Sequence, residues 1–209
     1  MTKRTRQSGD SPDSQPSLEQ RLEYTFQDED PSNRPPYSRP PLDEFGEVKW
    51  RAHCQCGKVS YKLRRERPLK AKFCHCRGCQ VMHGAPFQWA AIFPKEDVRF
   101  DNGTSGLSFY AAREKNTKYQ TPTKISCAVC RTPIMDEGRN MCLLFPQLID
   151  FSSSPEEQRE RVETFLPSCH IFYEYRLRDI HDGIPKWSGI DEESERLDDN
   201  GKPLEDSGE

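Results

Sequence analysis

Residues 73–84 read FCHCRGCQVMHG and place three cysteines, Cys74, Cys76 and Cys79, within six positions. A structural zinc ion takes four protein ligands in a closed tetrahedron, whereas a catalytic zinc keeps three and leaves one position open. The stretch therefore belongs either to a site that is closed by a ligand from elsewhere or to a metal site that is open to a substrate. The other cysteines decide between these two interpretations.

Seven of the nine cysteines fall into three groups along the chain. Besides the triplet, Cys54 and Cys56 form a CxC pair in AHCQCGKV, and Cys127 and Cys130 form a CxxC pair in ISCAVCRT. Together the two pairs supply four thiolates, the ligand set of a closed structural zinc, and would clamp segments roughly seventy residues apart. The triplet then keeps three thiolates, as in a catalytic site. We expect two zinc ions; recruitment of Cys127 or of a histidine by the triplet stays open.

Clustered thiolates select zinc or iron–sulfur, and the usual bacterial iron–sulfur run is longer and ends in Cys-Pro. The two remaining cysteines, Cys142 and Cys169, are expected to pack as small apolar groups. His75 lies between two predicted ligands, so its side chain should point away from the metal. His170 begins a predicted strand, where a packing role and a functional role are both open. The other histidines are expected at the surface: His53, His83 and His181.

The composition predicts one folded domain with disordered ends. Hydrophobic residues make up 33% of the 209 residues, charged residues 31%, and there are 17 prolines. We predict a disordered tail at 1–45, a zinc-binding domain at 46–190 and an acidic disordered tail at 191–209, because such ends cannot bury enough apolar surface to offset their ordering entropy. A transient helix at 17–26 and a role of the tails in partner binding remain open.

Charge and hydropathy exclude several classes of partner. The net charge of −3 and pI near 6.0 give no case for nucleic-acid binding. No run of ~18 apolar residues occurs, so the sequence predicts no membrane span. The basic start MTKRTRQSGD lacks the apolar segment of a secretory signal. We therefore expect a cytoplasmic protein in a reducing compartment, where clustered cysteines are metal ligands or catalytic groups before they are disulfides.

Between the ends the pattern is mainly that of β-strands. KVSYKL at 58–63 alternates apolar and polar side chains, and VRFDNG at 98–103 ends in an Asn-Gly turn signal. SPEEQRERVETF at 154–165 predicts a helix with Ser154 as its cap and Pro155 at the first position. Further strands are predicted at 85–94, 107–112, 140–146 and 170–177. Together, these predicted strands and the one helix indicate a mainly β fold.

The cysteine layout resembles the glutathione-dependent formaldehyde-activating enzyme family, which includes proteins of the centromere protein V type. The matching pieces are HCQCGKVSYKL, FCHCRGCQVMHGAPFQWAAIFPKEDVRF, NGTSGLSFY, ISCAVCRTPIM and PSCHIFYEYR, in family order. The resemblance implies a compact two-sheet fold stapled by zinc, with one structural and one open zinc. It implies the first zinc on Cys54, Cys56, Cys127 and Cys130, and the second on Cys74, Cys76 and Cys79.

The family's activity joins formaldehyde and glutathione to S-hydroxymethylglutathione and is classed as a carbon–sulfur lyase. The resemblance therefore implies a glutathione-like thiol and an aldehyde as small-molecule partners. Three departures bear on the substrate. Arg131 stands where the family has glycine after CxxC, and segment 152–166 is longer than the family's minimum. The family commonly has a tryptophan shortly after the HIF strand, whereas here Trp187 comes later in the chain.

Two hypotheses from different classes follow from these observations. In the first, the triplet metal binds an incoming thiol and favours its thiolate, which attacks an aldehyde carbon. In the second, the chain is a non-catalytic, zinc-stapled binding module whose tails contact other proteins. A fourth protein ligand on the triplet metal would favour the binding module, and an open position beside a pocket would favour the enzyme. A redox thiol switch is a third, weaker reading.

Overall fold

The computed structural model describes residues 30–151 and 154–204. The transient helix expected at 17–26 and the outermost parts of both predicted tails lie outside these residues. Among the described residues, no helix combines the length and the apolar character needed to cross a membrane.

The described chain is mainly β and forms two sheets, as predicted. A small antiparallel sheet has the order β1-β2-β5, and a nine-stranded mixed sheet has the order β12-β11-β10-β3-β4-β9-β8-β7-β6. The small sheet consists of β1 (Trp50–His53), β2 (Ser60–Leu63) and β5 (Val98–Phe100). The large sheet consists of β3 (Lys70–Cys74), β4 (Gln88–Pro94), β6 (Leu107–Tyr110), β7 (Thr123–Cys127), β8 (Pro133–Glu137), β9 (Met141–Leu144), β10 (Cys169–Ile171), β11 (Lys186–Trp187) and β12 (Arg196–Leu197).

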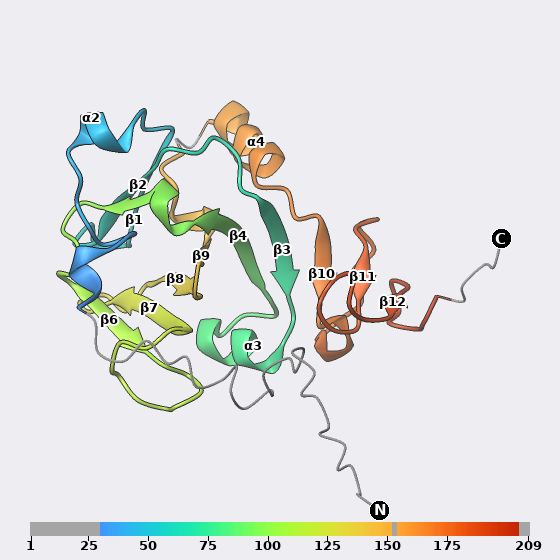
Figure 1. Ribbon diagram of the computed structural model, residues 1–209. Coiled ribbons are helices and arrows are strands. Elements are labelled where there is room, and N and C mark those ends of the chain that lie inside the picture. Colours follow the sequence, from blue (N-terminus) through green and yellow to red (C-terminus); the bar gives the residue numbers. More distant parts are fainter. Residues whose placement is uncertain (1–29, 152–153, 205–209) are drawn as a thin grey trace, which may run out of the picture.

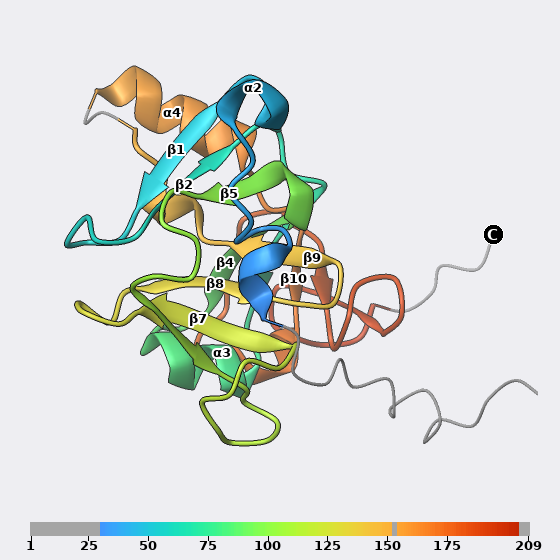
Figure 2. The same cartoon turned by 60° about the vertical axis from the view of Figure 1, so that its left-hand side comes forward.

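Figure 1 shows the large sheet curving from β6 and β7 at one side, through β4 and β3, to β10 and β11 at the other. Figure 2 shows β1, β2 and β5 of the small sheet stacked above β7 and β8. Buried side chains of both sheets, including Tyr61, Phe93, Phe100 and Ile134, form one core. Because residues two apart on a strand share a face, the alternating pattern of β2 places Tyr61 and Leu63 in this core.

The helices are short and lie at the edges of the sheets. Helix α4 (Pro155–Thr164) begins as predicted, with the Ser154 hydroxyl accepting the Glu157 N–H at 3.2 Å. Helix α3 (Arg77–His83) follows β3 directly and ends at Gly84, whose φ of 57° gives a left-handed cap. The remaining helical turns are η1 (Pro31–Asn33), α2 (Leu42–Phe45), η2 (Lys95–Asp97), η3 (Pro146–Leu148) and η4 (Tyr173–Tyr175).

The strand predicted at 170–177 is shorter than expected. β10 ends at Ile171, and Phe172 takes a left-handed conformation with φ 54°, after which the chain turns into η4. This turn buries Tyr173, whose hydroxyl donates to the Asp199 carbonyl at 2.9 Å. The prediction was wrong beyond Ile171 because burial of Tyr173 outweighs the local strand preference.

Both ends of the described chain are packed further than the composition indicates. Tyr37 is buried, lies against Phe100 and donates to the buried carboxylate of Glu137 at 2.6 Å. At the other end, Asp191 is buried and forms an ion pair with Lys72 of β3. A few buried contacts thus suffice to hold the described parts of these polar segments, residues 30–45 and 191–204.

Candidate metal centres

The first cysteine group joins the small sheet to the large one. Cys54 follows β1 and Cys56 lies in the next turn, whereas Cys127 ends β7 and Cys130 lies in the turn after it. The four sulfurs all lie within 4.8 Å of one another, with 3.6 Å between Cys54 and Cys56 and 3.9 Å between Cys56 and Cys127. We call this group the quartet.

Two tight turns aim these sulfurs at a common point. Gly57 has φ 73°, and its N–H donates to the Cys54 carbonyl at 2.9 Å. After the second pair, Arg131 adopts φ 64°, and its N–H donates to the Cys127 carbonyl at 3.0 Å. A side chain other than glycine costs about 1 kcal/mol or more in this left-handed region. The quartet turn therefore holds Arg131 in a conformation that glycine would take more easily.

The quartet spacing fits a tetrahedral thiolate site. Four thiolates about 2.3 Å from one zinc ion would have their sulfurs about 3.8 Å apart. The sulfur separations of 3.6 and 3.9 Å match this value. The Thr132 hydroxyl lowers the pKa of the Cys130 thiol to about 5 through a hydrogen bond. Within the quartet, the thiolate form is therefore favoured at Cys130.

The second group, the triplet, lies at the junction of β3 and α3. Cys74 ends β3, Cys76 caps the N-terminus of α3, and Cys79 lies in the first turn of the helix. The Cys79 N–H donates to the Cys76 sulfur at 3.4 Å. All three sulfurs lie within 4.8 Å of one another. No histidine, carboxylate or fourth cysteine of the described residues joins this group.

Hydrogen bonds between the thiols make the triplet electrostatically uneven. The Cys74 and Cys79 thiols donate to the Cys76 sulfur and hold the pKa of Cys76 well below its usual range. Hydrogen bonds with Cys74 and then with Cys76 raise the pKa of Cys79. One thiolate is thus stabilised by two S–H donors, and a bound cation would take the place of those protons.

The histidines divide into a surface group and a buried pair. His53 is half-exposed and pairs with Asp150 at 2.9 Å, and His181 is exposed and lies 3.2 Å from Asp199. His75 points away from the triplet, as predicted, and its Nε2 lies 2.8 Å from Nδ1 of His170. Burial lowers the pKa of His75 to about 4 and also lowers the pKa of His170.

The other residues that were singled out have packing positions. Cys142 and Cys169 are buried, as predicted. His83 ends α3 and packs edge-on against Phe145, with ring centroids 4.9 Å apart, so it is less exposed than expected.

A cavity of about 130 Å³ is lined by chain neighbours of both groups: Met82 and His83 of α3, the helix that carries Cys79, and Ser126 and Arg131, which flank the Cys127–Cys130 pair. Lys124 of β7 faces it and forms an ion pair with Asp136 of β8, and its charge interacts with Cys79 and Cys76. Arg131 reaches the same cavity from the quartet turn. Its lining consists of Met82, His83, Tyr110, Lys124, Ile125, Ser126, Arg131, Pro133 and Asp136.

Sequence reasoning missed Lys124 and Asp136 as residues of the site. Both lie on paired strands, in the register Lys124↔Asp136, and only this pairing brings them to α3. For Arg131 a signal was present, because it stands directly after CxxC, where the resembling family has glycine.

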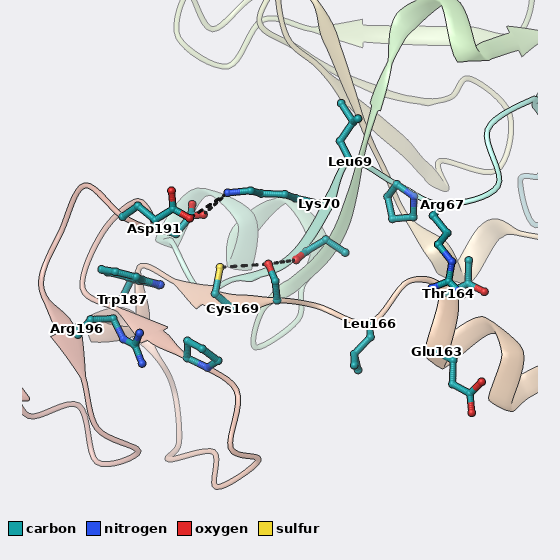
Figure 3. A pocket seen from close by; sticks show the side chains of 15 residues that line it. Arg67, Leu69, Lys70, Glu163, Thr164, Leu166, Cys169, Trp187, Asp191 and Arg196 are labelled. Carbon is teal, nitrogen blue, oxygen red and sulfur yellow. Dashed lines mark hydrogen bonds and ion pairs between the residues drawn. The ribbon is translucent and has the colours of Figure 1, made fainter.

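A larger cavity of about 510 Å³ lies on another side of the molecule (Figure 3). It extends from the end of α4 along β3 to β10 and β11, and its lining includes Leu69, Leu166 and Trp187. Cys169 also faces it, whereas no residue of α3 and none of the turns that carry the quartet does. This cavity is therefore farther along the chain fold from both cysteine groups than the smaller one, which Met82, His83 and Arg131 line.

Residues 49–174 match the family model described as glutathione-dependent formaldehyde-activating enzyme. No curated protein sequence matches the chain. Among solved structures, the crystal structure of a Rhodobacter sphaeroides protein from structural genomics is similar at 18% sequence identity and a TM-score of 0.40. That match covers 52% of this chain and 94% of the other. Since the family model spans more than half of the sequence, the chain belongs to the glutathione-dependent formaldehyde-activating enzyme family.

Proposed function

We propose that this protein is a zinc-dependent enzyme of the carbon–sulfur lyase type that acts on a thiol–aldehyde adduct such as S-hydroxymethylglutathione. A structural zinc would be held by the quartet and a second zinc by the triplet. One observation carries the proposal: among the described residues the triplet offers three sulfurs without a fourth protein ligand, and Lys124, whose charge interacts with Cys79 and Cys76, lines a nearby cavity. Three ligands and an open position are the arrangement of catalytic zinc.

A zinc ion on the triplet would favour the thiolate form of a bound thiol at neutral pH. In the cleavage direction the adduct's C–S bond breaks, its electron pair stays on sulfur, and the hydroxyl proton leaves as the carbonyl forms. In the reverse direction the thiolate attacks the aldehyde carbon, and the resulting oxygen takes up a proton. Cys74, Cys76 and Cys79 would hold the metal throughout and form no covalent bond to the substrate.

The chain's own residues would bind and orient the adduct in the cavity. The cationic groups of Arg131 and Lys124 suit a carboxylate of the thiol partner, and Lys124 stays close to the triplet through its ion pair with Asp136. Apolar side chains of Ile125 and Met82 form part of the same wall and limit the access of water. The arrangement favours a small, anionic thiol over a bulky one.

The test combines metal quantitation with turnover. Purified wild-type protein should contain two zinc ions per chain and form or cleave S-hydroxymethylglutathione. A Cys76→Ser variant should lose one zinc and its turnover, while keeping the other zinc. Unchanged turnover in that variant would refute the mechanism. Two bound zinc ions with no turnover on any thiol–aldehyde adduct would favour the binding module, and absence of zinc would favour a redox thiol switch.

A further inference from the structure

A buried hydrogen-bonded chain runs directly behind the triplet. Nε2 of His75 lies 2.8 Å from Nδ1 of His170, and Nε2 of His170 lies 2.9 Å from Oδ2 of Asp182. Both imidazole rings are 1% exposed. We call His75, His170 and Asp182 the histidine chain.

The acceptor at its outer end fixes the direction of every hydrogen bond. An ionised Asp182 can only accept, so His170 donates from Nε2. A neutral His170 then has a lone pair on Nδ1, and His75 must donate to it from Nε2. His75 is left with an unprotonated Nδ1, and this atom is buried without a hydrogen-bond partner. The histidine chain therefore specifies one tautomer and one ring orientation for each histidine.

A buried lysine anchors the outer end. The Lys186 ammonium is 2% exposed and lies 2.8 Å from carboxylate oxygens of both Asp182 and Asp199. It also donates to the Ile184 carbonyl at 2.8 Å and lies 5.6 Å from the ring centroid of Tyr173. A charge that is buried to this degree is stable only while its partners stay in place, so Asp182 has little freedom to move.

Backbone hydrogen bonds from β10 also hold the segment that carries His75, on the side where His170 lies. β10 pairs in parallel with β3, with Ile171 opposite Cys74, and the His75 N–H donates to the Ile171 carbonyl at 3.0 Å. Farther along, Lys70 of β3 pairs with Asp191 (Figure 3). Because successive side chains of an extended segment point to opposite sides, anchoring His75 on this side turns Cys74 and Cys76 towards Cys79.

We propose that the histidine chain orients Cys74 and Cys76 for metal binding, so that the segment following β10 is a working part of the triplet site. Its members are positioning residues and do not bind the metal themselves. Asp182, Lys186 and Asp199 lie beyond the family match at residues 49–174, so this support is added by a part of the chain outside the family domain. The inference rests on the proposed function in so far as the triplet binds zinc.

The experiment measures each metal site separately. Zinc-loaded protein is exposed to increasing EDTA and then alkylated, and mass spectrometry of the peptides reports the labelling of the triplet and of the quartet. The variants are His170→Phe, which keeps an aromatic ring against Phe73, and Asp182→Asn. The matched control is Asp179→Asn, which makes the same change in a surface ion pair with Arg176.

Residues that orient metal ligands typically change metal affinity by about 10–100-fold. We expect both test variants to release the triplet zinc at an EDTA concentration that is lower than for the wild type by roughly tenfold or more. Zinc release from the quartet of these variants, and from both sites of the control variant, should be unchanged. Unchanged triplet release in both variants overturns the proposal, and so does equal loss from triplet and quartet, which indicates general destabilisation.

A second measurement does not depend on zinc or on any variant. Long-range ¹H–¹⁵N spectra of the wild-type protein should show His75 protonated at Nε2 and bare at Nδ1. Protonation of His75 at Nδ1 overturns the histidine chain. If the wild-type triplet holds no zinc, the proposed function fails instead, and the tautomer still decides whether the chain exists.

Discussion

Removal of two cysteines from the quartet should lower the stability of the fold much more than removal of two cysteines from the triplet. The quartet connects Cys56 to Cys127, which lie 71 positions apart. In the triplet, Cys74 and Cys79 lie only five positions apart. If a metal staple acts like a covalent cross-link on the unfolded chain, closing the longer loop contributes about 4 kcal/mol and closing the shorter one about 2 kcal/mol. The quartet should therefore stabilise the fold by about 2 kcal/mol more than the triplet.

The comparison uses two double variants of zinc-loaded protein. Cys127→Ser with Cys130→Ser leaves no cross-link between the sheets, and Cys76→Ser with Cys79→Ser removes the triplet site. For a chain of this size, 1 kcal/mol shifts Tm by about 2–4 °C. We expect the quartet variant to melt roughly 4–8 °C below the triplet variant in calorimetry under reducing conditions.

A buried cysteine outside both groups controls for the substitution itself. Cys142 is fully buried, like Cys127, and Cys142→Ser places a hydroxyl in the core without removing a candidate ligand. Its Tm loss should persist when zinc is removed by a chelator, whereas the wild type should fall towards the quartet variant. Equal melting temperatures of the two double variants, or a lower one for the triplet variant, would refute the assignment of the structural role to the quartet.

Three further outcomes test other parts of the structure. Arg131→Gly relieves the strained left-handed backbone at this position and should raise the free energy of unfolding by about 0.5–1 kcal/mol. In the same variant, KM for S-hydroxymethylglutathione should rise and KM for an uncharged thiol adduct should not. A rise in KM for both adducts contradicts carboxylate binding. Tyr37→Phe leaves the Glu137 carboxylate one donor short and should cost about 1.5–3 kcal/mol in urea unfolding; a loss below 0.5 kcal/mol contradicts this. Desolvation opposes ionisation of Asp182, but hydrogen bonds from Lys186 and His170 lower its pKa from 3.8 to about 2. The stability difference between wild type and Asp182→Asn should therefore be full above pH 3.8 and shrink as the pH falls towards 2; a constant difference across this range contradicts it.

The sequence was sufficient to group the cysteines, because short CxC and CxxC spacings confine two sulfurs to one turn. The same is true of β2 and α4, where alternation and the Ser154 cap act over a few residues. Local chemistry of this kind is visible without a fold. The structure places the quartet and triplet sulfurs as the grouping predicts, within 4.8 Å in each group.

The histidine chain could not be predicted in the same way. His75 and His170 are 95 positions apart, and they meet only through the parallel register of β3 and β10. From the sequence alone, Lys186 is expected at the surface like most lysines. Only the fold shows that two aspartates and Tyr173 surround it. A similar limit applies to Tyr37, since a proline-rich segment gives no periodic signal for one buried aromatic residue.

The lining of the smaller cavity includes chain neighbours of both cysteine groups. Arg131 is held in its left-handed conformation by the turn that carries Cys130, so its position in the cavity depends on the quartet. The opposite wall comes from Met82 and His83 at the end of α3, whose first turn carries Cys79. If the quartet holds a structural metal, its removal should loosen the Arg131 turn. We therefore expect removal of the quartet cysteines to weaken binding of an anionic thiol while the triplet still holds its metal.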